Sequence, residues 1–351
     1  MSSRKSKRSS GWFLLLAVLL AGVGGYWAVT RYLGFADAPI PGLHAGETLQ
    51  VERGDSFAVV IAKLQNTHAS RERILEWQAL GRQMGVAGKL QVGEYALEPG
   101  TTPRMLLLRM REGKVISYRF TIVEGWNIHE LRAALARAQP LRHDAGQLDD
   151  VGLMKALGHP RVHPEGRFLP ETYVYTRGDG ELSLLHRAFD AMTVALDKAW
   201  TSRAKDLALH SPGQALILAS IVEKETGIAS ERPDIAGVFL RRLQSGMRLQ
   251  TDPTVIYGMG AAYAGNIRRV DLLTDTPYNT YTRDGLPPTP IAMPGMAALQ
   301  AATHPAAGDA LYFVAIGDGS GRHVFTRSLA EHQAAVQQYL QRYRARESST
   351  Q

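Results

Sequence analysis

Two glutamates, Glu223 and Glu225, stand one residue apart in the otherwise largely apolar segment LILASIVEKETG (residues 216–227). In a helix each residue is turned by about 100° from the one before it, so these two carboxylates lie about 160° apart. Three aliphatic side chains lie within about 60° of Glu225: Leu218, Ile221 and Val222. We therefore expect Glu225 on the apolar face of a helix and Glu223 on the other side, towards solvent or a partner.

A carboxylate packed against aliphatic side chains loses hydration, which raises its pKa and lets it hold a proton near neutral pH. A general acid in catalysis needs this property. Glu225 is therefore the candidate catalytic acid. From this helix alone, the alternative is that Glu225 forms an ion pair with a buried Arg or Lys and only stabilises the core.

The helix that carries Glu225 has clear signals at both ends. Ser211 fits an N-cap, Pro212 fits the first helical position, and Gln214 completes an S-x-x-Q capping box. Gly227 is expected to end the helix. The sequence thus predicts a well-defined helix with the acid in its last turn.

A second helix and two polar segments follow. Four apolar residues are expected to face inward before this helix ends at Gly246: Ile235, Val238, Phe239 and Leu243. The segments from there to Gly295 are too rich in polar residues, Gly and Pro to form much core, and such loops often carry binding residues. Several of their amide, hydroxyl, carboxylate and aromatic groups suit polyhydroxylated sugars: Gln250, Thr251, Asp252, Tyr257, Asn279, Thr280 and Tyr281. The alternative for some positions is that Asp, Asn and Pro merely build turns.

The composition restricts the classes of function. The chain has 351 residues, of which 45% are hydrophobic and 21% charged, the balance of a folded protein with two or three domains. Four basic residues near the N-terminus account for four of the seven net positive charges, so the rest of the chain gives no strong case for binding nucleic acid. Cysteine is absent, which excludes disulfides, thiolate metal sites and a cysteine nucleophile.

No motif points to a metal or a cofactor, and we expect neither. The HELRA segment at His129 lacks the second histidine of H-E-x-x-H, because position 133 is Ala. His159 and His163 are each followed by proline, which argues against a regular helix that would aim both at one ion. The sequence has no G-x-S-x-G, Walker loop or dinucleotide fingerprint.

The N-terminal segment predicts a membrane anchor. Residues 11–30 contain no charged side chain, and about 20 residues at 1.5 Å rise match the ~30 Å hydrocarbon layer. Aromatic residues flank this segment, and four basic residues precede it: Arg4, Lys5, Lys7 and Arg8. This pattern predicts a cytoplasmic N-terminus, with everything after Tyr32 outside. A cleaved signal peptide is the alternative, but its apolar region is usually shorter and ends in a small-residue cleavage site.

A small module is expected after a Gly- and Pro-rich linker. A strand leads to Gly54, a helix with N-caps at Asp55 and Ser56 follows, then a second helix, the strand GEYAL and a third helix after Thr101. The segment VERGDSFAVVIAKL (residues 51–64) resembles the start of a LysM repeat, a small peptidoglycan-binding module. A structural spacer with the same fold is the alternative. From residue 116 onward the pattern is that of a larger mixed α/β domain.

Three long segments carry a resemblance that covers most of the chain: residues 165–175 (EGRFLPETYVY), 219–260 and 278–295. They resemble the endolytic murein transglycosylases of the YceG-like (MltG) family. The resemblance implies cleavage within peptidoglycan glycan strands, with the second Glu of EKE, here Glu225, as the catalyst. The first segment departs from the pattern that we expect for the family, because Arg167 and Glu171 replace a more aromatic sequence.

The resemblance also implies the reaction and the setting. Glu225 would protonate the oxygen between N-acetylmuramic acid and N-acetylglucosamine, and then take the proton of the muramoyl C6 hydroxyl to leave a 1,6-anhydro end. The candidates for binding the sugars are Gln250, Thr251, Asp252, Tyr257, Asn279, Tyr281 and Glu171. The enzyme would act on nascent strands from the bacterial inner membrane, with its catalytic domain in the periplasm and peptidoglycan synthases as candidate partners.

The expected fold class is α+β, with a single transmembrane helix. The expected boundaries are a cytoplasmic basic tail at 1–10, a transmembrane anchor at 11–32, a linker at 33–48, a LysM-like subdomain at 49–115 and a YceG-like catalytic domain at 116–345. Two other functions remain open. A muramidase would use water, with Asp252 or Glu171 as its second carboxylate. A noncatalytic scaffold would bind glycan through residues 49–115 only.

Overall fold

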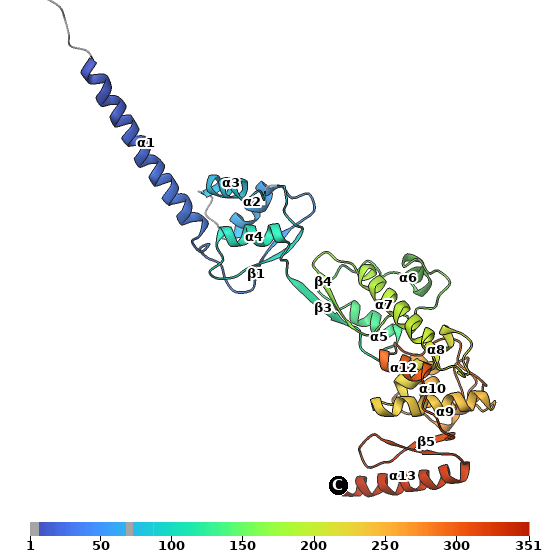
Figure 1. Ribbon diagram of the computed structural model, residues 1–351. Coiled ribbons are helices and arrows are strands. Elements are labelled where there is room, and N and C mark those ends of the chain that lie inside the picture. Colours follow the sequence, from blue (N-terminus) through green and yellow to red (C-terminus); the bar gives the residue numbers. More distant parts are fainter. Residues whose placement is uncertain (1–6, 68–72, 87, 351) are drawn as a thin grey trace, which may run out of the picture. The chain divides into compact units, whose positions relative to one another are not determined.

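The computed structural model describes residues 7–67, 73–86 and 88–350 (Figure 1). The chain divides into two compact units. The first runs to Tyr118 and includes Thr176–Gly178, and the second comprises Arg119–Tyr175 and Asp179–Gln351. Both helices and strands are present, so the mixed α+β class expected from the sequence is confirmed.

Helix α1 (Lys7–Ala36) is the apolar N-terminal segment. Its stretch from Gly11 to Ala36 is 26 residues long, and the most apolar part of that stretch is not buried against the rest of the protein. By length and composition, α1 can cross a membrane. The helix continues four residues beyond the predicted end of the anchor at Tyr32.

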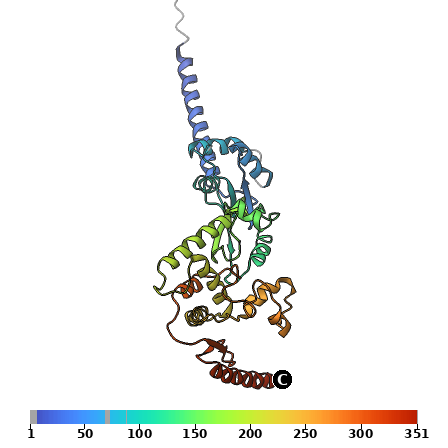
Figure 2. The same cartoon turned by 90° about the vertical axis from the view of Figure 1, so that its right-hand side faces the viewer.

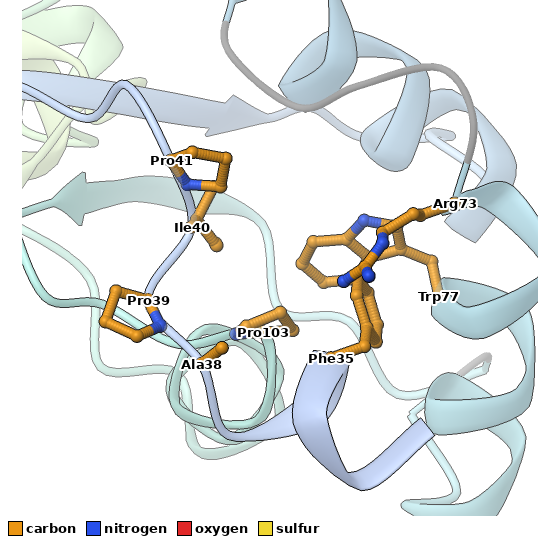
Figure 3. Close-up of a pocket in the computed structure, with 8 residues that line it drawn as sticks. All are labelled: Phe35, Ala38, Pro39, Ile40, Pro41, Arg73, Trp77 and Pro103. Atoms are coloured by element: carbon orange, nitrogen blue, oxygen red, sulfur yellow. The ribbon is translucent and has the colours of Figure 1, made fainter. Parts of the chain in front are cut away.

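The exit from α1 is packed into the first unit. Phe35 and Ala36 are buried there together with Ile40, and the Phe35 ring meets Trp77 edge to face at a centroid distance of 5.2 Å. Figure 3 shows Phe35, Ile40 and Trp77 among the side chains that line a cavity of about 130 Å³. The segment 33–48, which the sequence analysis expected to be a linker, thus begins with residues of α1 that pack into this core.

The first unit has the predicted order of elements. Its strands and helices are β1 (Glu47–Val51), α2 (Phe57–Thr67), α3 (Ile74–Gln83), β2 (Gly93–Leu97) and α4 (Pro103–Glu112). The two strands pair antiparallel, with Leu49 opposite Tyr95. The caps of α4 follow the sequence signals, since Thr102 accepts a hydrogen bond from the Met105 amide and Gly113 has a φ of 66°.

The second unit is mostly helical and contains two strand pairs. Its elements are β3 (Ser117–Thr121), α5 (Ile128–Leu135), α6 (Asp150–Ala156), β4 (Thr172–Thr176), α7 (Glu181–Thr201), α8 (Pro212–Glu225), α9 (Arg232–Gln244), α10 (Asp252–Met259), α11 (Arg269–Leu273), α12 (Met296–Thr303), β5 (Tyr312–Ala315), β6 (His323–Thr326) and α13 (Leu329–Thr350). The first two residues of β3 and the last residue of β4 are assigned to the first unit. Strand β3 pairs with β4, and β5 pairs antiparallel with β6. The two views of Figures 1 and 2 show helix α13 beside the β5–β6 pair.

Helix α8 lies at the centre of the core of the second unit. It packs against α7, α9 and α12. Residues on several of its faces are fully buried: Ala215, Leu216, Leu218, Ala219, Ser220, Ile221 and Val222. A helix covered on most sides holds its last residue in a fixed position, and that residue is Glu225.

Both ends of α8 differ in detail from the expected pattern. Ser211 is the N-cap and accepts from the Gln214 amide at 3.2 Å, as predicted. The Gln214 side chain, however, accepts from the amide of His210 rather than from that of Ser211. At the other end the backbone turns extended at Thr226, so the helix stops two residues before Gly227.

The inward stripe of α9 is confirmed. Ile235, Val238 and Phe239 are buried, and Gly246 follows the helix with a φ of 68°. The polar segments after it are more regular than expected, because they contain the short helices α10 and α11. Asp252, expected in a loop, is the first residue of α10.

Candidate active site

Glu225 lines a cavity of about 430 Å³ and is only partly exposed. The cavity is formed by α8, α9, the segment before α10, β5 and α13, together with Tyr281 from a loop. The residues lining the cavity are Glu225, Phe239, Arg242, Leu249, Gln250, Thr251, Asp252, Tyr281, Tyr312, Phe313, Val314, Leu329, His332 and Val336. A cavity of this volume accommodates part of an oligosaccharide rather than a whole strand.

The carboxyl group of Glu225 is held by a hydroxyl and shielded from water. The Thr251 hydroxyl donates a hydrogen bond to Oε1 of Glu225. The pKa of Glu225 is raised to about 7, mainly by burial. The Thr251 hydrogen bond and the Arg242 charge lower this pKa, and the negative charge of Asp252 raises it. A carboxyl group with this pKa can both donate and recover a proton near neutral pH.

Thr251 is itself fixed by a short backbone motif. Gln250 adopts a left-handed conformation with a φ of 49°, which is uncommon for a residue other than glycine. Its amide donates to the Thr280 carbonyl at 3.1 Å, and the Thr251 amide donates to the Thr280 hydroxyl at the same distance. The Thr254 hydroxyl closes the motif by donating to the Thr251 carbonyl at 2.7 Å. These bonds orient the hydroxyl that contacts Glu225.

Asp252 and Tyr281 form a second polar pair in the cavity. The Tyr281 hydroxyl donates to Asp252 at 2.6 Å. The structure thus brings four of the sequence candidates together with Glu225 around one cavity: Gln250, Thr251, Asp252 and Tyr281.

The other three candidates do not line this cavity. Tyr257 donates from its hydroxyl to Glu165 at 3.0 Å, and its ring packs edge to face on Tyr278. Asn279 is buried, and its side-chain amide donates to carbonyls of the preceding turn, including that of Thr274 at 2.7 Å. Glu171 is exposed, and its carbonyl accepts from the Ile122 amide.

Glu223 faces away from Glu225, as expected, but not towards solvent. Its side chain is only 4% exposed and pairs with Arg232 at 2.8 Å. Its second oxygen accepts from the Gly295 amide at 2.9 Å. The buried ion pair that the sequence left open for Glu225 thus belongs to Glu223, while no salt bridge joins Glu225 to any residue in the described ranges.

Arg242 is a cavity residue that the sequence analysis missed. It is buried on α9, and its guanidinium donates to the carbonyls of Leu311 at 2.6 Å and Leu249 at 2.7 Å. Arg242 follows Val238 by four residues and so lies on the inward stripe of the helix. This spacing could have identified it from the sequence. Arg242 connects the start of β5 to the segment before Thr251 and brings a positive charge near Glu225.

Glu165 is a second buried acid that the sequence analysis did not single out. It is fully buried, and its carboxylate accepts from the Ile128 amide at 3.0 Å and from the Tyr257 hydroxyl at 3.0 Å. Burial raises its pKa to about 7 against these hydrogen bonds. Because it does not line the cavity of Glu225, its contacts connect the start of α5 to α10 rather than to a ligand there.

The histidines considered as metal ligands have other contacts. The ring of His159 stacks on Phe189 at a centroid distance of 4.1 Å, and Nδ1 of His163 accepts from the Glu165 amide at 3.2 Å. Over the ranges that the structure describes, no group of three or more His, Asp or Glu side chains is placed to hold a metal ion.

Known proteins are similar to this chain over most of its length. The profile of the YceG-like family matches residues 49–338. The chain is 30% identical to an endolytic murein transglycosylase of Bacillus subtilis over 312 residues, which is 83% of this chain and 84% of that protein. It is also 31% identical over 188 residues to an endolytic murein transglycosylase of Streptococcus pneumoniae, covering 49% of this chain and 33% of the relative.

A solved structure is similar as well. The crystal structure of a putative yceG-like protein from Listeria monocytogenes superposes with a TM-score of 0.53 at 27% sequence identity. The match covers 82% of this chain and 98% of the crystallised chain.

Proposed function

The chain belongs to the YceG-like family, and from this premise we propose that it is a lytic transglycosylase that cleaves peptidoglycan glycan strands internally. The family expected from the sequence is thereby confirmed. The single observation that supports Glu225 as the catalyst is its place in the cavity, with a pKa raised to about 7 and one oxygen held by Thr251. The relatives named above carry the same activity in their names.

The proposed reaction needs one carboxyl group that acts twice. Protonated Glu225 donates its proton to the oxygen between N-acetylmuramic acid and N-acetylglucosamine as that glycosidic bond breaks. The resulting carboxylate then accepts the proton of the muramoyl C6 hydroxyl, whose oxygen forms the new bond to C1. Glu225 is protonated again at the end, and no water is consumed. The products are a 1,6-anhydro end and a new N-acetylglucosamine end.

The polar residues around Glu225 have separate roles in this proposal. Thr251 binds Oε1, which leaves the other carboxyl oxygen to exchange the proton. The positive charge of Arg242 and the negative charge of Asp252 oppose each other in setting the pKa of Glu225. Gln250 and Tyr281 line the cavity and are proposed to bind the sugar hydroxyl and acetamido groups.

A water-using muramidase is the second candidate function. The position of Asp252 supports it. A muramidase needs a second carboxylate beside the acid, and Asp252 lines the same cavity as Glu225. Glu171 lacks that position, since it is exposed and does not line the cavity. Against this candidate, the Tyr281 hydroxyl occupies one oxygen of Asp252.

We propose two further features at the N-terminal end. The order β1-α2-α3-β2 and the GDS helix start support a LysM-like subdomain at 49–115 that binds glycan. Helix α1 is proposed to anchor the protein in the bacterial inner membrane, with a cytoplasmic N-terminus and the catalytic unit in the periplasm. There it would meet nascent strands and the synthases that make them.

Mass spectrometry of the products tests the proposed reaction. Purified residues 33–351 incubated with soluble peptidoglycan oligomers should release fragments with 1,6-anhydro ends, and the Glu225→Gln variant should release none. Fragments with reducing, hydrated ends would establish the muramidase instead. Equal product from the wild type and the Glu225→Gln variant would show that Glu225 is not the acid.

A further inference from the structure

The C-terminal helix supplies one wall of the cavity around Glu225. Helix α13 packs beside β5 and β6, as both Figures 1 and 2 show. Three of its residues line the cavity at positions i, i+3 and i+7, which lie on one face of a helix: Leu329, His332 and Val336. Two of these three are aliphatic, so His332 is the polar group that this wall offers.

The ring of His332 is held in place by its neighbours. It stacks on Tyr312 at a centroid distance of 5.2 Å and an interplanar angle of 22°. Tyr312 in turn lies 5.1 Å from the guanidinium carbon of Arg242. Because Arg242 is fixed by two backbone carbonyls, this row of side chains gives the imidazole a defined orientation.

The imidazole is neutral and has one N–H group to donate. Burial and the positive charge of Arg242 lower the pKa of His332, so the neutral form predominates at pH 7. Nδ1 is buried and has no hydrogen-bond partner within the described residues. An unpaired buried N–H group is rarer in proteins than an unpaired acceptor, so we assign the proton to Nε2.

Most other polar groups of the cavity are already bonded to the protein. The Thr251 hydroxyl donates to Glu225, the Tyr281 hydroxyl donates to Asp252, and Arg242 donates to the Leu249 and Leu311 carbonyls. The His332 ring, like the side chains of Gln250 and Tyr312, forms no hydrogen bond in the part of the chain that the structure describes.

We propose that His332 is a substrate-binding residue whose Nε2–H donates a hydrogen bond to an acceptor oxygen of the N-acetylated glycan bound at Glu225. The inference rests on the proposed function and extends it to the C-terminal helix. A neutral donor suits a sugar hydroxyl, ring or acetamido oxygen, none of which carries a charge. Helix α13 is then part of the binding site and not only a terminal support.

Variants at position 332 separate the donor from the ring. His332→Phe keeps a flat ring against Tyr312 and lacks the donor, His332→Gln places an amide N–H near the position of Nε2, and His332→Asn is too short to do so. Gln333→Phe, on the exposed side of α13, is the matched control. The Glu225→Gln background, which cannot turn over, allows equilibrium binding of a soluble peptidoglycan oligomer to be measured by calorimetry.

Losing one neutral hydrogen bond should raise Kd by roughly 3- to 10-fold in His332→Phe and His332→Asn. Kd should change by less than about 2-fold in His332→Gln and Gln333→Phe. In the active Glu225 background, the same variants should raise KM by the same factors with little change in kcat. A thermal melt of each variant identifies any that fail to fold. If His332→Phe is one of them, the comparison of His332→Gln with His332→Asn still tests whether an N–H donor at this position is needed for binding.

Equal Kd for the wild type, His332→Asn and His332→Phe would overturn the inference, and so would a His332→Gln variant that binds as weakly as His332→Asn. These outcomes are independent of the reaction. If the wild type releases anhydro ends and His332 variants bind normally, only the role of His332 is wrong. If His332 variants bind weakly but the wild type leaves hydrated ends, only the transglycosylase reaction is wrong.

Discussion

Glu223 and Glu225 lie within one turn of α8, but their side chains make different contacts. Glu225 projects into a cavity, where a hydroxyl holds it and no cation neutralises it by direct contact. Glu223 instead pairs with Arg232 and binds the Gly295 amide, so it joins α8 to the segments on either side. In the proposed function, Glu225 performs the chemistry, while Glu223 of the same E-K-E triplet stabilises the packing.

The hydrogen bond from Thr251 should set the pH profile of the reaction. Since this bond favours the ionised form of Glu225, its removal in Thr251→Val raises the pKa of Glu225 above about 7. Activity requires the protonated acid, so the alkaline limb of the kcat/KM profile should move to higher pH. Initial rates measured from pH 5 to 9 on soluble glycan check this. An alkaline limb at lower pH in the variant would contradict the assigned donor direction.

Removing Glu223 should destabilise the fold more than it changes chemistry. Glu223→Ala leaves the guanidinium of Arg232, whose side chain is 9% exposed, with only Glu124 at 3.6 Å, and leaves the Gly295 amide unpaired. Loss of one partner from a buried ion pair typically costs about 3 kcal/mol of unfolding free energy. Chemical denaturation measures this.

The matched control is Asp284→Ala, which breaks the exposed pair with Arg248 and should cost less than about 1 kcal/mol. A similar loss in both variants would mean that the Glu223 pair is not buried in solution.

Between elements, Glu165 is the main polar connection of α5 to α10. Its carboxylate accepts from the first residue of α5, Ile128, and from Tyr257 in the second turn of α10. Because α10 starts at Asp252, directly after Thr251, this connection helps to hold the segment that contacts the catalytic acid.

The burial of Glu165 should make stability depend on pH. Its folded pKa, about 7, lies above its ordinary value of 4.5, so the folded state binds its proton more tightly than the unfolded chain. The stability from this group is full below about pH 4.5 and is lost as pH rises to about 7, by roughly 3 kcal/mol. Glu165→Gln should therefore flatten the fall of unfolding free energy between pH 5 and 8.

Denaturant titrations at several pH values measure this slope, with the exposed Glu171→Gln as the control. The pKa values of Glu225 and Glu223 are also raised by burial, so part of the slope should remain in Glu165→Gln and become smaller when Glu225→Gln is added. A slope that Glu165→Gln leaves unchanged would contradict the buried position of this acid.

Capping residues and apolar spacing predicted the helices and strands well. Contacts between residues far apart in the sequence could not be predicted in this way. The cap at Ser211 and the inward stripe of α9 follow from residue types and spacing alone. The ion pair of Glu223 was not predictable in the same way, because Arg232 and the Gly295 amide reach it only after the chain has folded back. The composition of the loops also misled, since Asn279 uses its amide to close a turn rather than to face the cavity.

The same distinction applies to the cavity. Gln250, Thr251, Asp252 and Tyr281 were found because they follow one helix or share a polar segment. Tyr312 and His332 were missed, since they approach Glu225 from about 90 or more residues further along the chain. The spacing of apolar residues in β5 or α13 does not indicate which of their side chains will face a cavity formed by a distant part of the chain.

At the scale of the molecule, the chain has two separate cores, and the proposed function assigns attachment to the first unit and chemistry to the second. The first unit buries its own apolar cluster, which includes Trp77 and Tyr95, and the second buries another around α8. Because Glu225 and every residue lining its cavity lie in the second unit, deletion of residues 49–115 should remove attachment rather than cleavage.

We expect this deletion to slow the digestion of intact sacculi by more than 10-fold and to leave cleavage of a short soluble oligomer within about 3-fold. Multivalent contact raises the effective concentration of a polymer at the site, and a short oligomer gains nothing from it. Parallel rate measurements with a thermal melt check this. Equal losses on both substrates with an unchanged melt would contradict a binding role for the module.

Because the C-terminal end of α1 is packed into the core of the first unit, the distance between that unit and a membrane spanned by α1 would be fixed. A flexible tether of n residues would let the unit wander by about 5–6 Å × √n, whereas Phe35 and Ala36 pass directly from the helix into the core. If α1 spans the bilayer and the first unit binds glycan, as proposed, this unit searches for strands within a thin layer parallel to the lipid surface. A Gly/Ser spacer inserted after Gly34 would thicken that layer and change which strands are reached, with every catalytic contact intact.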